Sequence, residues 1–384
     1  MHIALVRKNY SLKKAGAERY CVNLSRQLQK LGHQVTVIGE TIDAELRDEV
    51  RFLPVPVRNT TSWAKNLSFA RNAEQIVNNN RFDVVHGLSR TPGVDTFRVT
   101  DPLQAHWLQV YYSPTWNWLQ HLNPRHRTIL QIERSIYQSD RIKRFIVQSR
   151  LDAELIQTYY QVPESKIRRV SNGIDLSQFH PGVREVRDLV RRELGLQDQP
   201  LLVFAGMDFR RKGLAWLIEA LHHVDRRDTR LLVLGSGNVR PYEKLAHRFN
   251  VGDRVIFAGR KQSMPRYYGA ADLFVLPTIY EPFPNVNLEA MACGVPVITT
   301  STAGGADIVV ERENGYLIPK ANAVLEMADK INAHLALPSG ERDRISVNCW
   351  ETAQRFPVEQ NARDTLRVLE EALLEKSNGQ SSRG

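Results

Sequence analysis

Two glutamates in one short stretch are the residues of this sequence best suited to chemistry. Glu281 lies in the Pro-rich segment EPFPN, and Glu289 follows inside an expected helix with Asn285 as its N-cap and Gly294 at its end. Free N–H groups at a helix N-terminus favour an anion, and carboxylates accept paired hydrogen bonds from vicinal hydroxyls. The pattern therefore predicts a site for a phosphorylated sugar or ribose. In a plainer interpretation, Glu281 is a loop charge and Glu289 only complements the helix dipole.

A cationic loop is the second candidate. Arg210, Arg211 and Lys212 follow an expected strand and precede an expected helix that opens at Gly213. Arg binds phosphate through two parallel N–H bonds, and Lys supplies a point charge. The position at a strand's carboxyl end favours phosphate binding over a solvated charge cluster. Gly16, before another expected helix, is a weaker signal of the same kind and is more often a turn residue.

Other chemistries find little support in the sequence. No Ser–His–Asp triad, metal-ligand cluster or P-loop stands out, so a metal site is not expected. The lone histidines His86 and His106 are more often structural than catalytic. Cys21, Cys293 and Cys349 are few, far apart and odd in number, which indicates a reducing compartment. With no secretory signal at the N-terminus, the chain is predicted to be cytoplasmic.

Strand and helix patterns alternate along the chain, which predicts βαβ units and parallel sheets. The expected strands are 1–7, 34–40, 84–89, 141–149, 200–209, 229–237, 254–259, 271–278 and 294–300. The expected helices are 15–33, 72–80, 150–160, 213–224, 286–293 and about 357–377. Ligands of such sheets bind at loops beyond the carboxyl ends of the strands.

The length of 384 residues predicts two domains, because a single core rarely serves so long a chain. We expect one Rossmann-like domain over residues 1–171 and a second over 172–356. The C-terminal helix, at about 357–377, is expected to pack back on the first domain and to be followed by a polar tail, 377–384. Two such domains facing each other predict a ligand cleft.

The excess of positive over negative charge is confined to the first half. Residues 1–172 hold 25 Lys and Arg against 15 Asp and Glu, whereas the rest hold 27 of each. One interpretation is a solvated basic surface; the other is a partner such as a membrane surface, a phosphorylated glycolipid or nucleic acid. Nucleic acid ranks last because no nucleic-acid-binding module is present.

An aromatic stretch with neighbouring cations lies in this basic half. The segment WLQVYYSPTWNW contains Trp107, Trp116 and Trp118, and Arg125 and Arg127 follow it. Aromatic residues beside cations are typical of a membrane interface. The alternative is an aromatic cluster buried against the first sheet.

Taken together, these motifs resemble the retaining GT-B glycosyltransferases of family 4. The resemblance is carried by EPFPNVNLE, RRKG, SNGID, the Gly-Gly after VITTSTA and ENGYLIP, and it is strongest from about Ser171 to Pro319. A narrower resemblance to the lipopolysaccharide core glucosyltransferases rests on GMDFRRKGLAWLIEAL, TPGVDTFRVTD and VPVRNTTSWAKN. It implies an α/β GT-B fold in which two doubly wound Rossmann-like domains face a central cleft. The first domain would bind the acceptor and the second the nucleotide sugar.

The resemblance also implies roles for individual residues. Glu281 would lie beside the donor sugar hydroxyls and Glu289 beside the ribose, and Arg211 with Lys212 would neutralise the diphosphate. The implied donor-binding residues are Gly16, Arg211, Lys212, Glu281, Phe283, Asn285, Val286 and Glu289. The implied catalytic residues are Asp101, Glu281 and Lys212.

One position departs from the family pattern, and at another place two residues compete for the same role. The family has two glycines where this chain has Ala15 and Gly16, which weakens the expected contact with the diphosphate. Asp101 matches an acidic residue near the reaction centre of the core glucosyltransferases. His106 is its rival as an acceptor-side or catalytic residue, because many family members use a histidine in this neighbourhood.

The implied reaction transfers a hexose, with glucose as the first choice, from a UDP-sugar to the heptose-containing core of lipopolysaccharide. Retention of configuration and independence of metals and other cofactors are implied as well. The enzyme would act peripherally on the inner face of the bacterial inner membrane, in contact with anionic lipids. Alternatives are a donor carrying N-acetylglucosamine, galactose or heptose, or an acceptor such as a capsule or another glycolipid. A remote alternative is a non-enzymatic α/β sugar-binding protein, which would not need the Arg211–Lys212 pair.

Overall fold

The computed structural model describes residues 1–13 and 16–381, and the chain divides into two compact units. Unit 1 comprises Met1–Gly173 and the residues from Val358 onward, and unit 2 comprises Ile174–Pro357. The sequence led us to expect domain boundaries after residues 171 and 356, and the structure divides the chain after Gly173 and Pro357. Ala15 and the last residues of the expected polar tail, 382–384, lie outside the described residues.

Unit 1 is built on a seven-stranded sheet with the order β5-β3-β1-β6-β7-β8-β9, in which neighbouring strands pair in parallel. Its strands are β1 His2–Val6, β3 Gln34–Gly39, β5 Arg51–Pro54, β6 Val84–Gly87, β7 Thr96–Arg98, β8 Arg144–Val147 and β9 Ile167–Arg169. A two-stranded ribbon pairs β2 Asn9–Tyr10 with β4 Thr41–Ile42. The central strand β1 is apolar and buried on both faces, as parallel strands covered by helices must be.

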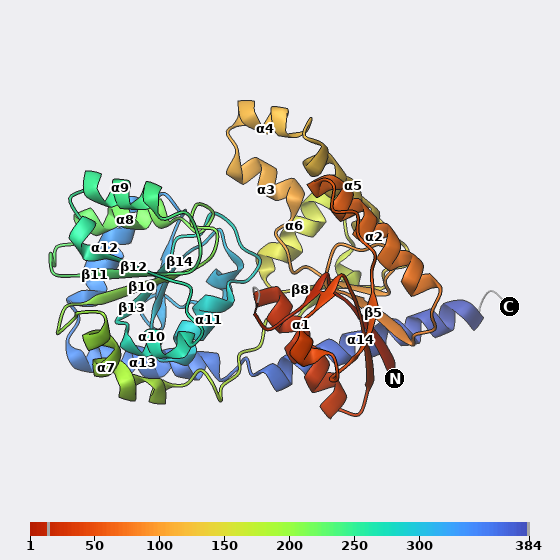
Figure 1. The fold of residues 1–384 in the computed structure, drawn as a ribbon. Coiled ribbons are helices and arrows are strands. Elements are labelled where there is room, and N and C mark those ends of the chain that lie inside the picture. Colours follow the sequence, from red (N-terminus) through yellow and green to blue (C-terminus); the bar gives the residue numbers. More distant parts are fainter. Residues whose placement is uncertain (14–15, 382–384) are drawn as a thin grey trace. The chain divides into compact units, whose positions relative to one another are not determined.

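Seven α-helices are described in unit 1, and one of them comes from the far end of the chain. They are α1 Gly16–Lys30, α2 Ser62–Asn78, α3 Gln104–Tyr111, α4 Pro114–Gln120, α5 Pro124–Tyr137, α6 Arg150–Tyr160 and α14 Val358–Ser381, with a short 3-10 helix, Ala44–Leu46, among the smaller turns. Figure 1 shows α14, in blue, among the red and orange elements of the first residues. Ala362 and Leu369 of α14 are buried in the same apolar cluster as Ile3 and Leu5 of β1, so the C-terminal helix completes the core of unit 1.

Unit 2 repeats the architecture with a six-stranded parallel sheet in the order β12-β11-β10-β13-β14-β15. Its strands are β10 Leu201–Ala205, β11 Arg230–Leu234, β12 Val255–Gly259, β13 Leu273–Leu276, β14 Val297–Thr300 and β15 Gly315–Ile318. Its helices are α7 Arg187–Glu193, α8 Leu214–His223, α9 Arg240–Arg248, α10 Met264–Ala270, α11 Asn285–Ala292, α12 Val324–Leu335 and α13 Ser339–Ala353. The strand order places β10 and β13 side by side at the centre, where their following loops meet.

One helix start differs from the sequence-based expectation. We expected Asn285 to cap the helix that carries Glu289, but the helix begins at Asn285 and Pro284 occupies the cap position without a side-chain cap bond. Pro284 has an extended backbone, which turns the chain into the helix without a capping side chain. Gly294 follows the helix with a φ of +72°, as a glycine that ends a helix does.

Among the helices within residues 1–13 and 16–381, none combines the length and the apolar character that a bilayer crossing requires.

Candidate functional site

The loops after β10 and β13 are fastened to each other in unit 2. The backbone N–H of Ile279 donates to the carbonyl of Arg211 at 2.9 Å, and the Thr278 hydroxyl donates to the same carbonyl at 3.3 Å. Gly213 has a φ of +78°, and a Cβ there would lie 2.0 Å from the carbonyl oxygen of Pro277. Only glycine fits this close approach. The sequence thus places the cationic loop directly against the segment that leads to Glu281.

Lys212 and Glu281 form the central ion pair of this region. The Lys212 ammonium lies 3.0 and 2.9 Å from the two carboxylate oxygens of Glu281, and the Arg211 guanidinium lies 3.3 Å from the same carboxylate. The Lys212 and Glu281 side chains are 9% and 15% exposed. Burial alone would raise the pKa of Glu281, but the two neighbouring cations outweigh it and hold this pKa below its usual value. The Glu281 carboxylate is therefore held in its charged form between these two cations.

Helix α11 brings Glu289 close to an aromatic hydroxyl. The Tyr268 hydroxyl of α10 donates to the Glu289 carboxylate at 3.0 Å. The backbone N–H of Gly304 donates to the Glu281 carbonyl at 2.9 Å, which holds the Gly-Gly segment beside the start of α11. Phe283 is buried, whereas Asn285 and Val286 are half-buried in the first turn of the helix.

Asn287, in the same first turn of α11, is an unexpected feature. Its side chain is fully buried, yet neither polar atom of its amide has a hydrogen-bond partner within the described parts of the chain. A buried amide without partners costs free energy. A Cβ at Gly305 would lie 2.6 Å from the Asn287 amide nitrogen, so the Gly-Gly segment packs tightly against this side chain.

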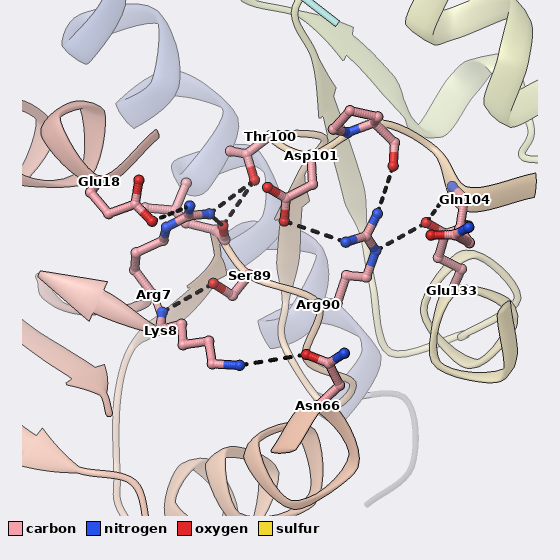
Figure 2. Close-up of polar contacts among 12 residues, drawn as sticks. Arg7, Lys8, Glu18, Asn66, Ser89, Arg90, Thr100, Asp101, Gln104 and Glu133 are labelled. Atoms are coloured by element: carbon pink, nitrogen blue, oxygen red, sulfur yellow. Dashed lines mark hydrogen bonds and ion pairs between the residues drawn. The ribbon is translucent and has the colours of Figure 1, made fainter. Parts of the chain in front are cut away.

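In unit 1, a guanidinium fixes the position of Asp101 (Figure 2). Arg90, after β6, lies 3.5 Å from the Asp101 carboxylate and 3.0 Å from that of Glu133, and it donates to the Pro102 carbonyl at 2.6 Å. Glu133 is buried, and this burial raises its pKa although Arg90 opposes the change. It also accepts from the backbone N–H of Gln104 at 2.8 Å. The segment that carries Asp101 is therefore fixed by hydrogen bonds at Pro102 and Gln104. The Asp101 side chain itself stays 37% exposed.

Two further cations follow β1 beside Asp101 (Figure 2). Arg7 pairs with Glu18 of α1 at 2.9 Å and donates to the Leu88 carbonyl at 2.5 Å. The Lys8 ammonium lies 3.5 Å from the side-chain oxygen of Asn66 on α2, and burial lowers its pKa. Arg7, Lys8, Arg90 and Asp101 thus gather at the carboxyl edge of the first sheet.

The other predicted residues of unit 1 lie on neighbouring helices. His106, on α3, is half-buried, and its Nδ1 atom lies 3.2 Å from the Tyr159 hydroxyl. Burial lowers the pKa of His106, so its neutral form is favoured at pH 7. Gly16 is the first residue of α1 and is exposed.

The aromatic stretch is divided between a packed part and an exposed part. Trp107 is half-buried and stacks on Tyr111 with ring centroids 4.1 Å apart. Trp116 and Trp118 of α4 are 62% and 68% exposed. Of the residues we expected at a membrane surface, the exposed ones are Trp116, Trp118, Arg125 and Arg127.

Sequence reasoning found some of these residues and missed others. It singled out Lys212 and Glu281 but not their direct contact. It missed Arg90 and Lys8, although each directly follows an expected strand and a survey of charged residues after strands would have found them. Tyr268 and Glu133 carry no such signal, because they lie on helices and reach their partners only through the fold. Within the described ranges no cluster of His, Cys, Asp and Glu has the geometry of a metal site.

Comparison with known proteins places the chain among glycosyltransferases. Residues 15–178 match the family described as Glycosyltransferase Family 4, and residues 199–336 match Glycosyl transferases group 1. The lipopolysaccharide glucosyltransferase WaaG of Escherichia coli K12 is 25% identical over 79% of this chain and 81% of its own length. An uncharacterized glycosyltransferase, MJ1607 of Methanocaldococcus jannaschii, is 27% identical over 83% of this chain and 86% of its own length.

Solved structures show the same fold. The crystal structure of WaaG, a glycosyltransferase involved in lipopolysaccharide biosynthesis, matches with a TM-score of 0.83 at 24% identity, covering 96% of this chain and 99% of that one. Anabaena HepE in complex with UDP-glucose matches with a TM-score of 0.73 at 19% identity, covering 96% and 100%. The α/β fold of GT-B type that the sequence predicts is therefore confirmed.

The Lys212–Glu281 pair should behave as one coupled unit. We expect Lys212→Met and Glu281→Gln each to lower the free energy of unfolding by about 2 kcal/mol, because each leaves a buried charge less well paired. The double variant should cost less than the sum of the two by about 1–3 kcal/mol. Urea unfolding of the four proteins measures this coupling, and strictly additive losses would contradict it.

The contribution of this ion pair to stability should also depend on pH. The folded-state pKa of Glu281 lies below its usual value, so its stabilising contribution is complete above the unfolded pKa of about 4.5 and is lost as the pH falls through the folded pKa. The stability difference between wild type and Glu281→Gln should therefore shrink in acid. A difference that grows as the pH falls would show that the carboxylate is not held by cations.

The contacts of Arg90 with Glu133 and Asp101 give a further prediction. Arg90→Gln should lower the free energy of unfolding by about 3 kcal/mol, because it leaves the buried Glu133 carboxylate without its cation. Asp101→Asn serves as the matched control. It should lower the free energy of unfolding by less than about 1 kcal/mol, since Asp101 is a partly exposed partner of Arg90. Adding Glu133→Gln to Arg90→Gln should restore part of the loss in urea unfolding. An equal loss of unfolding free energy in Arg90→Gln and Asp101→Asn would overturn the prediction.

Proposed function

Because the chain belongs to the group 1, family 4 glycosyltransferases, we propose that it transfers a hexose, with glucose as the first choice, from a UDP-sugar to the heptose-containing core of lipopolysaccharide. The observation that carries the proposal is the paired Lys212 and Glu281 beside Arg211 in unit 2. This arrangement combines cations for a diphosphate with a carboxylate for sugar hydroxyls. A binding protein without catalytic activity has no need of such a buried, mutually charged cluster.

Each side chain of unit 2 has a distinct task in this proposal. Arg211 and Lys212 neutralise the diphosphate and stabilise the negative charge that develops on it as it departs. Glu281 accepts hydrogen bonds from the sugar hydroxyls, and Glu289 accepts them from the ribose. Phe283, Asn285 and Val286 place the first turn of α11 against the donor, and Gly16 of unit 1 adds a backbone contact.

The acceptor is assigned to unit 1. The Arg90 guanidinium orients Asp101 next to the acceptor hydroxyl, and His106 is the alternative residue for this role. The acceptor hydroxyl attacks from the face that the diphosphate leaves, which retains the anomeric configuration. Protein cations supply the positive charge that the leaving group needs, and we propose that neither a divalent metal nor another cofactor takes part.

Several comparisons support a UDP-sugar and a glycolipid, and one favours an alternative. HepE structures contain UDP and UDP-glucose, and WaaG is a lipopolysaccharide glucosyltransferase. A D-inositol 3-phosphate glycosyltransferase of Xylanimonas cellulosilytica is 33% identical over 59% of this chain. The second candidate is therefore the same chemistry with another donor sugar or another acceptor.

We also propose that the enzyme works in the cytoplasm, peripherally on the inner face of the bacterial inner membrane. The exposed Trp116 and Trp118 lie on α4, and Leu122 is 60% exposed beside them. Arg125 and Arg127 follow on the exposed surface. Aromatic and apolar side chains beside cations suit the interface of a membrane with anionic lipids.

A panel of UDP-, ADP- and GDP-sugars tests the donor. UDP-glucose at 100 times its Kd should stabilise the protein by about 2.7 kcal/mol in a thermal-shift assay and should be slowly hydrolysed. Glu289→Ala should weaken donor binding by about 10- to 100-fold, since it removes a charged hydrogen-bond acceptor. Glu326→Ala is the control, because this exposed glutamate lies on α12. The proposed function is wrong if two results are found together: no sugar nucleotide stabilises the protein, and none reacts with deacylated lipopolysaccharide core in its presence.

Liposome flotation tests the membrane proposal. The protein should float with vesicles of anionic phospholipid and should not float with neutral vesicles. Trp116→Ala/Trp118→Ala should reduce flotation several-fold, because each change removes a large exposed aromatic surface. Trp63→Ala is the control, since Trp63 is 42% exposed on α2 of the same unit. Equal flotation of the double variant and wild type would contradict the proposal.

A further inference from the structure

A hollow lies at the opposite edge of the unit 2 sheet from the candidate donor residues. It has a volume of about 380 Å³. Pro200, Asp272 and Pro296 line it, and each directly precedes a strand, namely β10, β13 and β14. Lys212 and Glu281 instead come after β10 and β13. At about 3.3 Å per strand residue, the two regions are roughly 15 Å apart.

Five arginines line this hollow. Arg184 comes from the 3-10 helix Pro181–Val186, Arg187 and Arg191 come from α7, which follows it directly, Arg226 from the loop before β11, and Arg342 from α13. Arg226 is paired with Asp228 at 2.8 Å. The arrangement brings three arginines of one helical run, at i, i+3 and i+7, together with arginines from two other segments. It concentrates guanidinium groups in a concave site, where they can bind an anion through paired N–H donors.

Asp272 already neutralises two of these arginines. Its carboxylate lies 2.6 Å from Arg187 and 3.6 Å from Arg191. Arg187 and Arg191 also donate to the Ala270 carbonyl at the end of α10, at 2.8 and 3.1 Å. These two side chains therefore form the fixed base of the hollow.

Arg184 and Arg342 are left to face a ligand. Arg184 is half-buried and donates to the Gly294 carbonyl at 3.1 Å. Burial lowers the pKa of Arg184, and the charge of Arg187 lowers it further, although Asp272 and Asp343 oppose the change. Over residues 1–13 and 16–381, neither Arg184 nor Arg342 has a carboxylate within ion-pairing distance. A bound anion would relieve this repulsion.

We propose that this hollow is a binding site for a small multivalent phosphate, of the class of pyrophosphate or a sugar phosphate. Its described lining holds no Phe, Tyr or Trp on which a nucleotide base could stack. Burial lowers the pKa of the lining His334 to about 4, so this ring adds no charge at pH 7. The site goes beyond the proposed transfer reaction and does not depend on it.

The carboxylates around the hollow limit the size of the ligand. Exposed Asp188, Asp198 and Asp343 also line it. These three charges repel an extended anionic surface such as a membrane or nucleic acid. A compact anion that contacts Arg184 and Arg342 is repelled by these carboxylates less than an extended anionic surface is.

Isothermal titration calorimetry of the full-length protein with inorganic pyrophosphate tests the site. Saturating UDP, or the variant Arg211→Gln/Lys212→Gln, removes binding at the candidate donor residues. We expect one pyrophosphate to bind in both backgrounds. Arg184→Gln/Arg342→Gln should weaken this binding by about tenfold or more, as the loss of charged hydrogen bonds predicts. Arg344→Gln, an exposed neighbour on α13, should leave it unchanged.

Two outcomes would overturn the site. One is the absence of pyrophosphate binding in both backgrounds. The other is equal affinity for wild type, Arg184→Gln/Arg342→Gln and Arg342→Gln. The single variant Arg342→Gln guards against misfolding, because Arg342 makes no hydrogen bond through its side chain within the described residues, and it should weaken binding on its own. Donor hydrolysis and thermal shift with UDP-glucose report separately on the proposed function.

Discussion

The buried ion pair of Lys212 and Glu281 is the contact on which the candidate donor site depends. It joins the loop after β10 to the loop after β13, and these loops also share hydrogen bonds at the Arg211 carbonyl. A buried carboxylate beside two cations remains charged only because each partner offsets the desolvation of the other. In the proposed function, Arg211 and Lys212 of this cluster also neutralise the sugar diphosphate.

Parallel sheets explain why polar clusters form where they do. In both units the strands run in one direction, so the loops at their carboxyl ends gather polar side chains along one edge. In unit 1 this edge collects Arg7, Lys8, Arg90 and Asp101 (Figure 2). The strands themselves are buried and apolar, so chemistry can change at the loops without disturbing the core. The clamp of Arg90 on Glu133 shows how one buried pair fixes an exposed carboxylate.

The sequence predicted the loops of the site better than the contacts within them. Lys212 and Glu281 could be identified because cations and a Pro-rich carboxylate follow apolar runs, and that signal is local. Their direct pairing could not, since it depends on β10 and β13 being neighbours in the sheet. Tyr268 and Glu133 reach the candidate sites from helices far along the chain, and no local pattern marks them. The cap at Asn285 was wrong by one residue, because Pro284 turns the chain without a side-chain bond.

The two edges of the unit 2 sheet illustrate a difference between balanced and unbalanced charge. At the carboxyl edge, the cations around Glu281 hold its pKa low. At the opposite edge, Asp272 pairs with Arg187 and Arg191, whereas burial and Arg187 lower the pKa of Arg184 although Asp272 and Asp343 oppose the change. A charge of this kind lowers stability unless something else binds to it. The imbalance therefore identifies a ligand site that neither strand order nor family membership indicates.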